Sequence, residues 1–281
     1  MDKEKAKDNA AGKKEEKVEQ KKESKQKEAK GDDKEFLAEL VSFMQRKGFI
    51  WGPEPEIYGG TAGFYTYAPL GKLLKNNAEN IIRRTLQGEE FYEVECPIIM
   101  DRKVWEASGH LGGFTDAIIT CSKCKSNFRV DNLLIDYPET KHFKQPEEFA
   151  KFIEEKSIKC PNCNGDLNKE VKKHNLMMRT TIGIDQEAYN RPETATTTYL
   201  PFLRFIDFFR RQPVFGVFQI GKVFRNEISP RQHVVRMREF TQAEAQLFIK
   251  KELKNNFDKF KNIENDVLPF WTWQSQEANK E

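Results

Sequence analysis

The amino-acid sequence predicts an α+β domain in which an antiparallel sheet is flanked by helices and interrupted by a cysteine-rich insertion. Three observations lead to this fold class. Apolar residues recur at helical spacing through residues 71–86. Residues 214–226 and 236–249 form two hydrophobic strands joined by a short loop, as in a β-hairpin. Two Cys-x-x-Cys pairs bracket a hydrophilic, lysine-rich stretch at residues 121–166.

Composition limits the possible classes of protein. The chain has 281 residues, 38% of them hydrophobic, which is enough for one large domain or two small ones. Charged residues make up 32%, yet the net charge is +3, so charge alone does not require a nucleic-acid partner. We find neither an apolar run long enough to span a membrane nor a secretory signal. We therefore expect a cytoplasmic protein without membrane contact, whose cysteines are thiols or metal ligands.

The first 34 residues consist mainly of lysine, glutamate and small residues. Such a segment buries too little apolar surface to offset the entropy lost on ordering. We expect a disordered charged tail or a frayed helix. The alternative is an arm that touches nucleic-acid phosphates, which the near balance of lysines and acids disfavours.

The remaining elements follow in order from periodicity and breakers. A helix is predicted to begin at Phe36 and end near Gly48. The glycine- and aromatic-rich segment 57–67 indicates tight backbone around a pocket or a close strand contact. Pro97 lacks a ladder donor, so the strand predicted at 91–100 should lie at an edge or bulge. After the insertion we expect a strand at 175–181, a helix at 195–209, and the two hairpin strands.

The two cysteine pairs are Cys121-Ser-Lys-Cys124 and Cys160-Pro-Asn-Cys163. Four thiolates at this spacing can close a tetrahedral zinc site, and four protein ligands would make that site structural. The alternatives are a redox pair or separate thiols. Cys96 stands alone in a predicted strand and is most simply a buried small hydrophobe.

The predicted hairpin carries charges within an otherwise apolar strand pair. Because side chains alternate along a strand, one face is expected to hold Arg236, Arg238, Phe240, Gln242 and Glu244. Arg225 and Glu227 share a face of the other strand, and 228–234 is the connecting loop. The ordinary interpretation is a solvent-facing surface. The hydrophobic flanks instead favour a covered sheet, where charges are costly unless paired or bound to a ligand.

These residue types suit a nucleoside triphosphate. Guanidinium groups match phosphate oxygens, and an aromatic ring offers a flat surface for a base. Carboxylates can accept from an adenine amino group or hold a bridging Mg²⁺.

Several separate strings resemble one family. Phe224-Arg-Asn-Glu227, a loop, and then Arg236, Phe240 and Glu244 at four-residue steps resemble motif 2 of class II aminoacyl-tRNA synthetases. The helix at 71–86 and the following strand resemble motif 1, the dimer interface of that class. Closer strings resemble the dimeric glycyl-tRNA synthetases: Glu56-Ile-Tyr-Gly-Gly, Ala62-Gly-Phe-Tyr-x-Tyr-x-Pro-Leu-Gly71, Ala107-Ser-Gly-His-Leu-Gly-Gly-Phe-Thr-Asp116, Arg191-Pro-Glu-Thr-Ala195 and Phe224-Arg-Asn-Glu-Ile-Ser-Pro-Arg231. The resemblance covers about residues 36 to 250 and implies the class II antiparallel sheet.

The resemblance implies a role for each matching residue. Arg225 would contact the ATP α-phosphate and the amino-acid carboxylate, Glu227 the adenine amino group, and Phe240 the adenine ring. Arg225 and Glu227 would be the catalytic residues. Glu193 would bind the glycine ammonium group. The wider sets are Asn226, Val235, Arg236 and Arg238 for ATP, and Arg129, Phe240, Gln242 and Glu244 for glycine.

The implied reaction is ATP-dependent formation of glycyl-adenylate and transfer of glycine to tRNA(Gly), with Mg²⁺ assisting. Two departures stand out. The family continues Arg-Pro-Glu-Thr-Ala with Gln-Gly, whereas this chain has Thr196 and Thr197. We also find no match to motif 3 or to the anticodon-binding domain. We therefore expect a homodimer through motif 1, or a complex with a chain that supplies these parts, and weak activity for this chain by itself.

This interpretation divides the sequence into four parts: a tail at 1–34, a first catalytic part at 35–120, a zinc-binding insertion at 121–166, and a second catalytic part at 167–281. Two alternatives belong to other classes of protein. A non-catalytic synthetase-like accessory protein tends to lose the motif 2 charges, which are present here. A zinc-ribbon nucleic-acid binder would explain the insertion and leave the hairpin unexplained.

Overall fold

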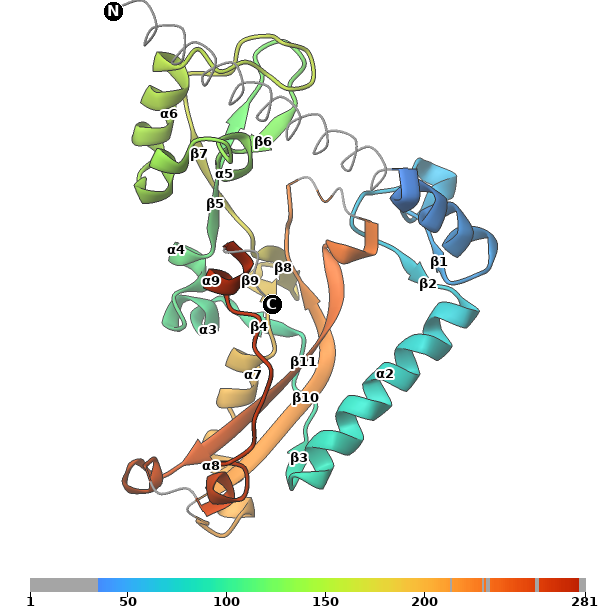
Figure 1. Cartoon of the computed structure of the whole chain (residues 1–281), viewed down its shortest axis with the longest axis vertical. Coiled ribbons are helices and arrows are strands. Elements are labelled where there is room, and N and C mark those ends of the chain that lie inside the picture. The colour runs from blue at the N-terminus through green and yellow to red at the C-terminus, as the bar shows by residue number, and fades with distance from the viewer. Residues whose placement is uncertain (1–34, 213, 229, 231–232, 256–257, 278–281) are drawn as a thin grey trace, which may run out of the picture.

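The computed structural model describes residues 35–277 apart from residues 213, 229, 231–232 and 256–257. The charged tail predicted at 1–34 lies outside the described residues, as do three residues of the predicted loop at 228–234. Figure 1 shows a long β-hairpin through the body of the molecule, with helix α2 (Pro69–Gly88) along one side and the cysteine-rich insertion at one end.

The hairpin consists of β10 (Val214–Phe224) and β11 (Glu239–Ile249), paired antiparallel over their whole lengths. The short strand β3 (Phe91–Glu93) pairs parallel to β10 on its other side, which gives the order β11-β10-β3. Apolar residues run almost continuously through β10, and Val217, Phe218 and Val223 are fully buried. This burial on both faces is what the hydrophobic sequence predicts for a covered strand.

The helices begin and end where proline and glycine allow. Residues 35–46 are helical, as the apolar spacing predicts. Helix α2 places Pro69 in its first turn, where a missing N–H costs nothing, and confirms the helix expected at 71–86. The single helix expected at 195–209 is wrong. Pro201 separates α7 (Ala195–Tyr199) from α8 (Phe202–Phe208), because a proline ring clashes with the preceding helical turn.

Two predicted strands are also divided. Residues 91–100 form β3 and β4 (Ile99–Asp101), which belong to different sheets, with Pro97 in the link between them. Residues 175–181 form the end of β7 (Lys172–Asn175) and most of β8 (Met178–Ile182). In both cases the chain leaves one sheet for another. β4 and β8 flank β9 (Gln186–Asn190) in a second antiparallel sheet.

The insertion has a sheet and a hydrophobic core of its own. β5 (Thr115–Thr120) pairs antiparallel with β6 (Asn127–Arg129) and with β7. Its core includes Ile119, Val130, Leu134 and Phe152, together with two of the cysteines. Figure 1 shows β5 and β7 as the link between this core and the body. The sheet therefore reaches from 115 to 175, beyond the cysteine pairs.

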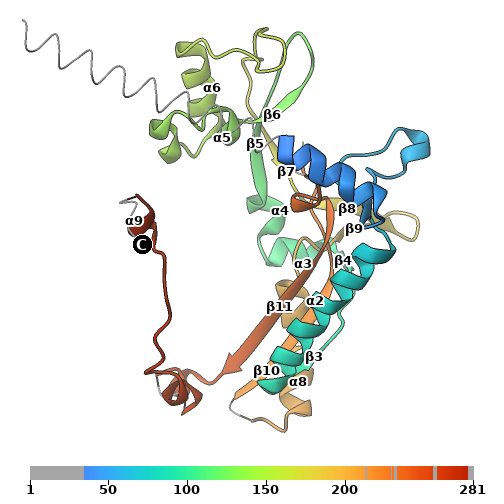
Figure 2. The ribbon, with the colours of Figure 1, turned by 45° about the vertical axis from the view of Figure 1, so that its right-hand side comes forward.

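The other short elements connect these parts. In the described part of the chain, no helix is long and apolar enough to cross a membrane. After β11 the chain leaves the sheet (Figure 2), and Nζ of Lys259 lies 2.9 Å from Oε2 of Glu90, just beyond the end of α2. The remaining elements are β1 (Ile50–Trp51), η1 (Glu56–Tyr58), β2 (Thr66–Tyr67), α3 (Arg102–Ala107), α4 (His110–Gly113), α5 (Val130–Leu133), η2 (Pro138–His142), α6 (Pro146–Glu155), η3 (His233–Val235), η4 (Lys251–Leu253), η5 (Asp258–Asn262) and α9 (Trp273–Glu277).

Candidate active site

The charged residues of the hairpin lie at its looped end. The strands are shorter than predicted, since β10 ends at Phe224 and β11 begins at Glu239. The strands therefore stop just short of three residues that they were expected to include: Arg225, Arg236 and Arg238. The Arg225 amide still donates to the Arg238 carbonyl at 2.9 Å, which continues the pairing by one step. Phe240, Gln242 and Glu244 share one face of β11, as the alternation of a strand requires.

The guanidinium group of Arg225 lies close to two aromatic rings. Its central carbon is 5.2 Å from the ring centre of Phe240 and 5.6 Å from that of Phe114, within the range of cation–π attraction. Its Nε donates to the Pro192 carbonyl at 3.2 Å. Arg225 therefore joins the hairpin to the Arg191-Pro-Glu-Thr turn and to the segment before β5.

Glu227 is buried, with 8% of its surface exposed, and forms an ion pair with Arg236. Nε and Nη2 of Arg236 both donate to Glu227 Oε2, at 3.0 and 2.7 Å. A buried carboxylate without such a partner would be strongly destabilising.

Arg129 lies in a second charge cluster beside the Glu227–Arg236 pair. Its Nη1 is 3.1 Å from Asp116 Oδ2, and its Nη2 is 2.6 Å from Asp131 Oδ2. Burial raises the pKa of Asp116, and the nearby Arg129 and Arg236 only partly oppose this. Arg129 thus comes near the hairpin, although its guanidinium is already engaged by two carboxylates.

Arg238 donates to the backbone of its own chain. Its guanidinium nitrogens donate to the carbonyls of Glu227 at 2.7 Å, Ala62 at 2.8 Å and Ile228 at 3.4 Å. Its amide donates to the Gly63 carbonyl at 2.8 Å. Gly63 has φ +91°, and a Cβ there would come within 2.9 Å of Arg238 Cγ. Arg238 therefore holds the glycine-rich segment against the hairpin.

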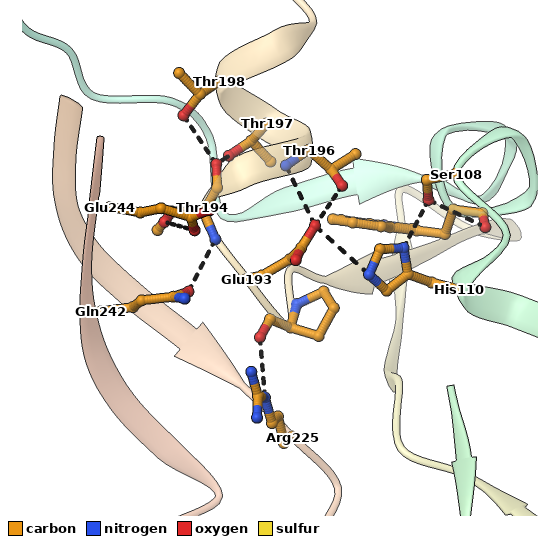
Figure 3. A network of polar contacts seen from close by, with 12 residues as sticks. Ser108, His110, Glu193, Thr194, Thr196, Thr197, Thr198, Arg225, Gln242 and Glu244 are labelled. Carbon is orange, nitrogen blue, oxygen red and sulfur yellow. Dashed lines mark hydrogen bonds and ion pairs between the residues drawn. The ribbon is translucent and has the colours of Figure 1, made fainter. Parts of the chain in front are cut away.

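Gln242 and Glu244 contact the Arg191-Pro-Glu-Thr turn from β11. The Thr194 amide donates to Gln242 Oε1 at 3.1 Å, and its hydroxyl donates to Glu244 Oε2 at 2.9 Å (Figure 3). Behind the turn, Arg191 is 2% exposed and donates to Gln219 Oε1 at 2.8 Å and to two backbone carbonyls. A buried polar network thus fixes the backbone on either side of Glu193.

The Glu193 carboxylate lies among polar groups from two segments. Its Oε1 accepts from the Thr196 hydroxyl at 2.6 Å and lies 3.5 Å from His110 Nε2. The other nitrogen of His110, Nδ1, is 2.8 Å from the Ser108 hydroxyl (Figure 3). His110 and Phe114 were not assigned roles from sequence, although both lie in the Ala107–Asp116 string. In that string, polar residues and glycines precede an aromatic residue, and this pattern could have identified His110 and Phe114 as candidate site residues.

Two candidate residues are not brought into these contacts. The Asn226 backbone pairs with Leu176 and His174, at 2.8 and 3.1 Å, which ties the hairpin end to the link between β7 and β8. The Val235 side chain is 79% exposed.

The four insertion cysteines form one cluster. The sulfur atoms of Cys121, Cys124, Cys160 and Cys163 all lie within 4.8 Å of one another, and two pairs are 3.6 Å apart. Four thiolates bound tetrahedrally about 2.3 Å from one zinc ion would stand about 3.8 Å apart. The cluster is therefore consistent with zinc.

Local hydrogen bonds also favour a thiolate in this cluster. The hydroxyl and amide of Ser126 lower the pKa of Cys124 to about 6. The amide of Gly165 lowers the pKa of Cys163, but burial and the neighbouring thiols outweigh it and raise this pKa to about 11. Among the described residues, no other group of three or more Cys, His, Asp or Glu side chains is close enough to hold a metal ion.

Comparison with known proteins gives a consistent set of relatives. The chain is 43% identical over 242 residues to the glycine–tRNA ligase of Methanococcus maripaludis strain C7, covering 85% of this chain and 42% of the relative. For the glycine–tRNA ligase of Methanocaldococcus jannaschii the identity is 43%, covering 84% and 41%. For that of Pyrococcus horikoshii it is 42%, covering 88% and 43%.

Other comparisons add little. No protein-family model matches the chain. The crystal structure of the RNA binding domain of threonyl-tRNA synthetase from Cryptosporidium parvum Iowa II superposes with a TM-score of 0.44 and 19% identity, covering 73% of this chain and 36% of that one. The sequence comparisons show that the chain is a homologue of the glycine–tRNA ligases. It spans about two fifths of their length.

Proposed function

We propose that this chain is the ATP- and glycine-binding portion of a glycine–tRNA ligase. The observation that carries the proposal is the convergence of Arg225, Phe240 and the Glu193–Thr194 turn at one end of the hairpin. A cation, a flat ring and a carboxylate from separate elements thus meet where a nucleotide and a small amino acid can be held together.

ATP would bind along the hairpin end. Adenine would stack on Phe240 and donate from its amino group to Glu227, whose Oε2 is already fixed by Arg236. Arg225 would contact the α-phosphate. We place Asn226, Val235 and Arg236 at the edge of this site, and we propose that Arg238 supports it through the backbone contacts described above.

Glycine would bind at the turn beside α7. Glu193 would accept from its ammonium group, and Arg225 would contact its carboxylate. Gln242 and Glu244 would act through Thr194, which both contact. Arg129 would contribute positive charge from its position near Glu227.

The chemistry needs no protein nucleophile. A glycine carboxylate oxygen attacks the α-phosphorus in line, a new phosphorus–oxygen bond forms, and the bond to the β-phosphate bridging oxygen breaks. Pyrophosphate leaves with the bonding pair. A tRNA hydroxyl oxygen then attacks the glycyl carbonyl carbon, the bond from that carbon to the phosphate oxygen breaks, and AMP leaves while the hydroxyl proton passes to solvent. Arg225 and Mg²⁺ would stabilise the charge that develops on the phosphate, so catalysis comes from positioning and electrostatics.

Partners follow from the same proposal. Helix α2 exposes Leu73, Leu74 and Ile81 at 60%, 63% and 65%, which is unusual for a helix facing water and fits a homodimer through motif 1. Because the chain spans about two fifths of its relatives, tRNA(Gly) charging is expected to need further polypeptide. Zinc would hold the insertion together, and the cytoplasmic location stays a prediction.

Glycine-dependent exchange of pyrophosphate into ATP tests the function. We expect weak exchange by this chain and strong exchange when a chain with the remaining ligase segments is added. Arg225→Ala should lower the rate by about 10²–10³-fold, as loss of a charge-stabilising donor does. Absence of exchange even with the added chain would favour a non-catalytic accessory protein.

A further inference from the structure

The turn after Glu193 is where this chain departs from the family pattern, and there Thr196 contacts the carboxylate. We propose that Thr196, supported by His110, is a positioning residue that holds Oε1 of Glu193 and leaves Oε2 as the oxygen that accepts the ammonium group of the amino acid. The inference rests on the proposed function and specifies how the ammonium group would be recognised.

The contacts on the two oxygens are unequal. Oε1 accepts from the Thr196 hydroxyl at 2.6 Å and from the Thr196 amide at 3.3 Å, and it faces His110 Nε2 at 3.5 Å. Oε2 accepts no hydrogen bond from any described residue. The Glu193 side chain is 29% exposed, so a ligand can reach it. A carboxylate fixed at one oxygen keeps its free lone pairs in a constant direction.

His110 supports Oε1 from the opposite segment. Nε2 of His110 lies 3.5 Å from Oε1, which is favourable when that nitrogen carries a proton, because a carboxylate can only accept. The other ring nitrogen, Nδ1, lies 2.8 Å from the Ser108 hydroxyl, which ties the imidazole to the same segment. The ring of Trp105, which is fully buried, and that of Phe114 pack edge-on against the imidazole at 5.5 and 5.9 Å. The imidazole is therefore held in one orientation.

The backbone on either side prevents Glu193 from moving away. Thr194 is anchored through its amide and hydroxyl to β11, and its carbonyl accepts from Gln219 Nε2 at 3.0 Å. Thr194 is fully buried. Because the main chain is fixed, loss of the Thr196 hydroxyl would free the rotation of the Glu193 side chain and leave the turn in place.

Two ligands separate recognition of the ammonium group from recognition of the nucleotide. Glycyl-sulfamoyl-adenosine carries the ammonium group, whereas sulfamoyl-adenosine lacks the glycyl part and keeps the nucleoside. Titration calorimetry with both would be performed on the wild type, Thr196→Val, Thr196→Ser and His110→Phe. Thr196→Val keeps the size and branching of the side chain and removes only the hydroxyl.

We expect Thr196→Val to weaken the glycyl compound about tenfold, the effect of losing one hydrogen bond to a charged group. Its affinity for sulfamoyl-adenosine should stay within about twofold, a difference that a general loss of structure would not produce. Thr196→Ser restores the hydroxyl and should restore the affinity. His110→Phe should show a smaller loss of the same kind, because its contact is longer.

The possible failures are distinct. If the wild type binds neither compound, either alone or together with the chain that supplies the remaining ligase segments, the proposed function is wrong. If it binds both and Thr196→Val weakens neither, or weakens both equally, the positioning role is wrong while the proposed function stands. Failure of Thr196→Ser to restore the affinity would also overturn the role of the hydroxyl.

Discussion

The guanidinium group of Arg191 takes the space that a side chain at position 221 would need. A Cβ built on Gly221 would lie 2.2 Å from Nη2 of Arg191. That group cannot swing aside freely, because Arg191 is buried and donates to Lys222, Cys96 and Gln219. Gly221 of β10 is thus what allows a buried arginine to support the turn that carries Glu193.

The first prediction follows from this contact. Gly221→Ala should lower the free energy of unfolding by about 1–3 kcal/mol, the usual effect of overpacking a fixed core. Urea unfolding followed by fluorescence measures it. Gly88→Ala is the matched control, since a Cβ at the end of α2 meets nothing within 4 Å. That variant should be neutral or more stable by about 0.4–1 kcal/mol. Equal losses in the two variants would contradict the steric explanation.

Arg238 gives the second prediction. Arg238→Lys keeps the charge and loses the geometry that reaches the carbonyls of Ala62, Glu227 and Ile228. We expect faster hydrogen–deuterium exchange in peptides covering residues 59–65 and a stability loss of about 1–3 kcal/mol. Arg84→Lys on the exposed side of α2 serves as control and should leave both unchanged. Unaltered exchange at 59–65 would show that Arg238 does not hold this segment.

The cysteine cluster gives the third prediction. Protein purified without chelator should contain one zinc ion per chain by mass spectrometry of the metal. Cys160→Ser should lower the zinc content to near zero and make the insertion sensitive to protease, because Cys160 is both a ligand candidate and part of the insertion core. Cys96→Ser lies outside the cluster and should keep its zinc. Zinc absent from the wild type, or lost equally from both variants, would rule out this site.

The fourth prediction concerns pH and the two carboxylates that share Arg129. Burial raises the pKa of Asp116, so the folded state holds its proton more tightly than the unfolded state. The stability that Asp116 contributes is present below pH about 4 and is lost as the pH rises through the raised pKa. Although burial acts in the opposite direction, Arg129 lowers the pKa of Asp131, so its contribution is present above pH about 4 and is lost on acidification.

As the pH rises from about 3 to about 6, the free energy of unfolding of Asp116→Asn should therefore increase relative to that of the wild type. Over the same rise in pH, the free energy of unfolding of Asp131→Asn should decrease relative to that of the wild type. Urea unfolding at several pH values measures both differences. Effects of pH that the three proteins share, such as metal release, cancel in the comparison. Slopes of the same sign for both variants would disprove the assignment.

The sequence by itself determined the elements whose cause is local. The helix at 71–86 follows from apolar spacing, the strand pair from two apolar runs around a polar loop, and the cysteine cluster from two short knuckles. The structure agrees with each, with strand ends shifted by two or three residues. The sequence also shows the prolines, yet the effect of Pro97 and Pro201 on the predicted strand and helix was underestimated. A proline indicates that a helix or strand is interrupted, but it does not show where the chain goes next.

Only the tertiary structure decided which distant residues meet. Phe114 and Phe240 are far apart in the chain, yet the ring centres of both lie within 5.6 Å of the Arg225 guanidinium carbon. The partner of Glu193 across the turn is His110, and Arg238 is occupied by Ala62 and Gly63. These pairings depend on how separate sheets pack and which buried charges need partners, and such long-range requirements leave no period or spacing in the sequence.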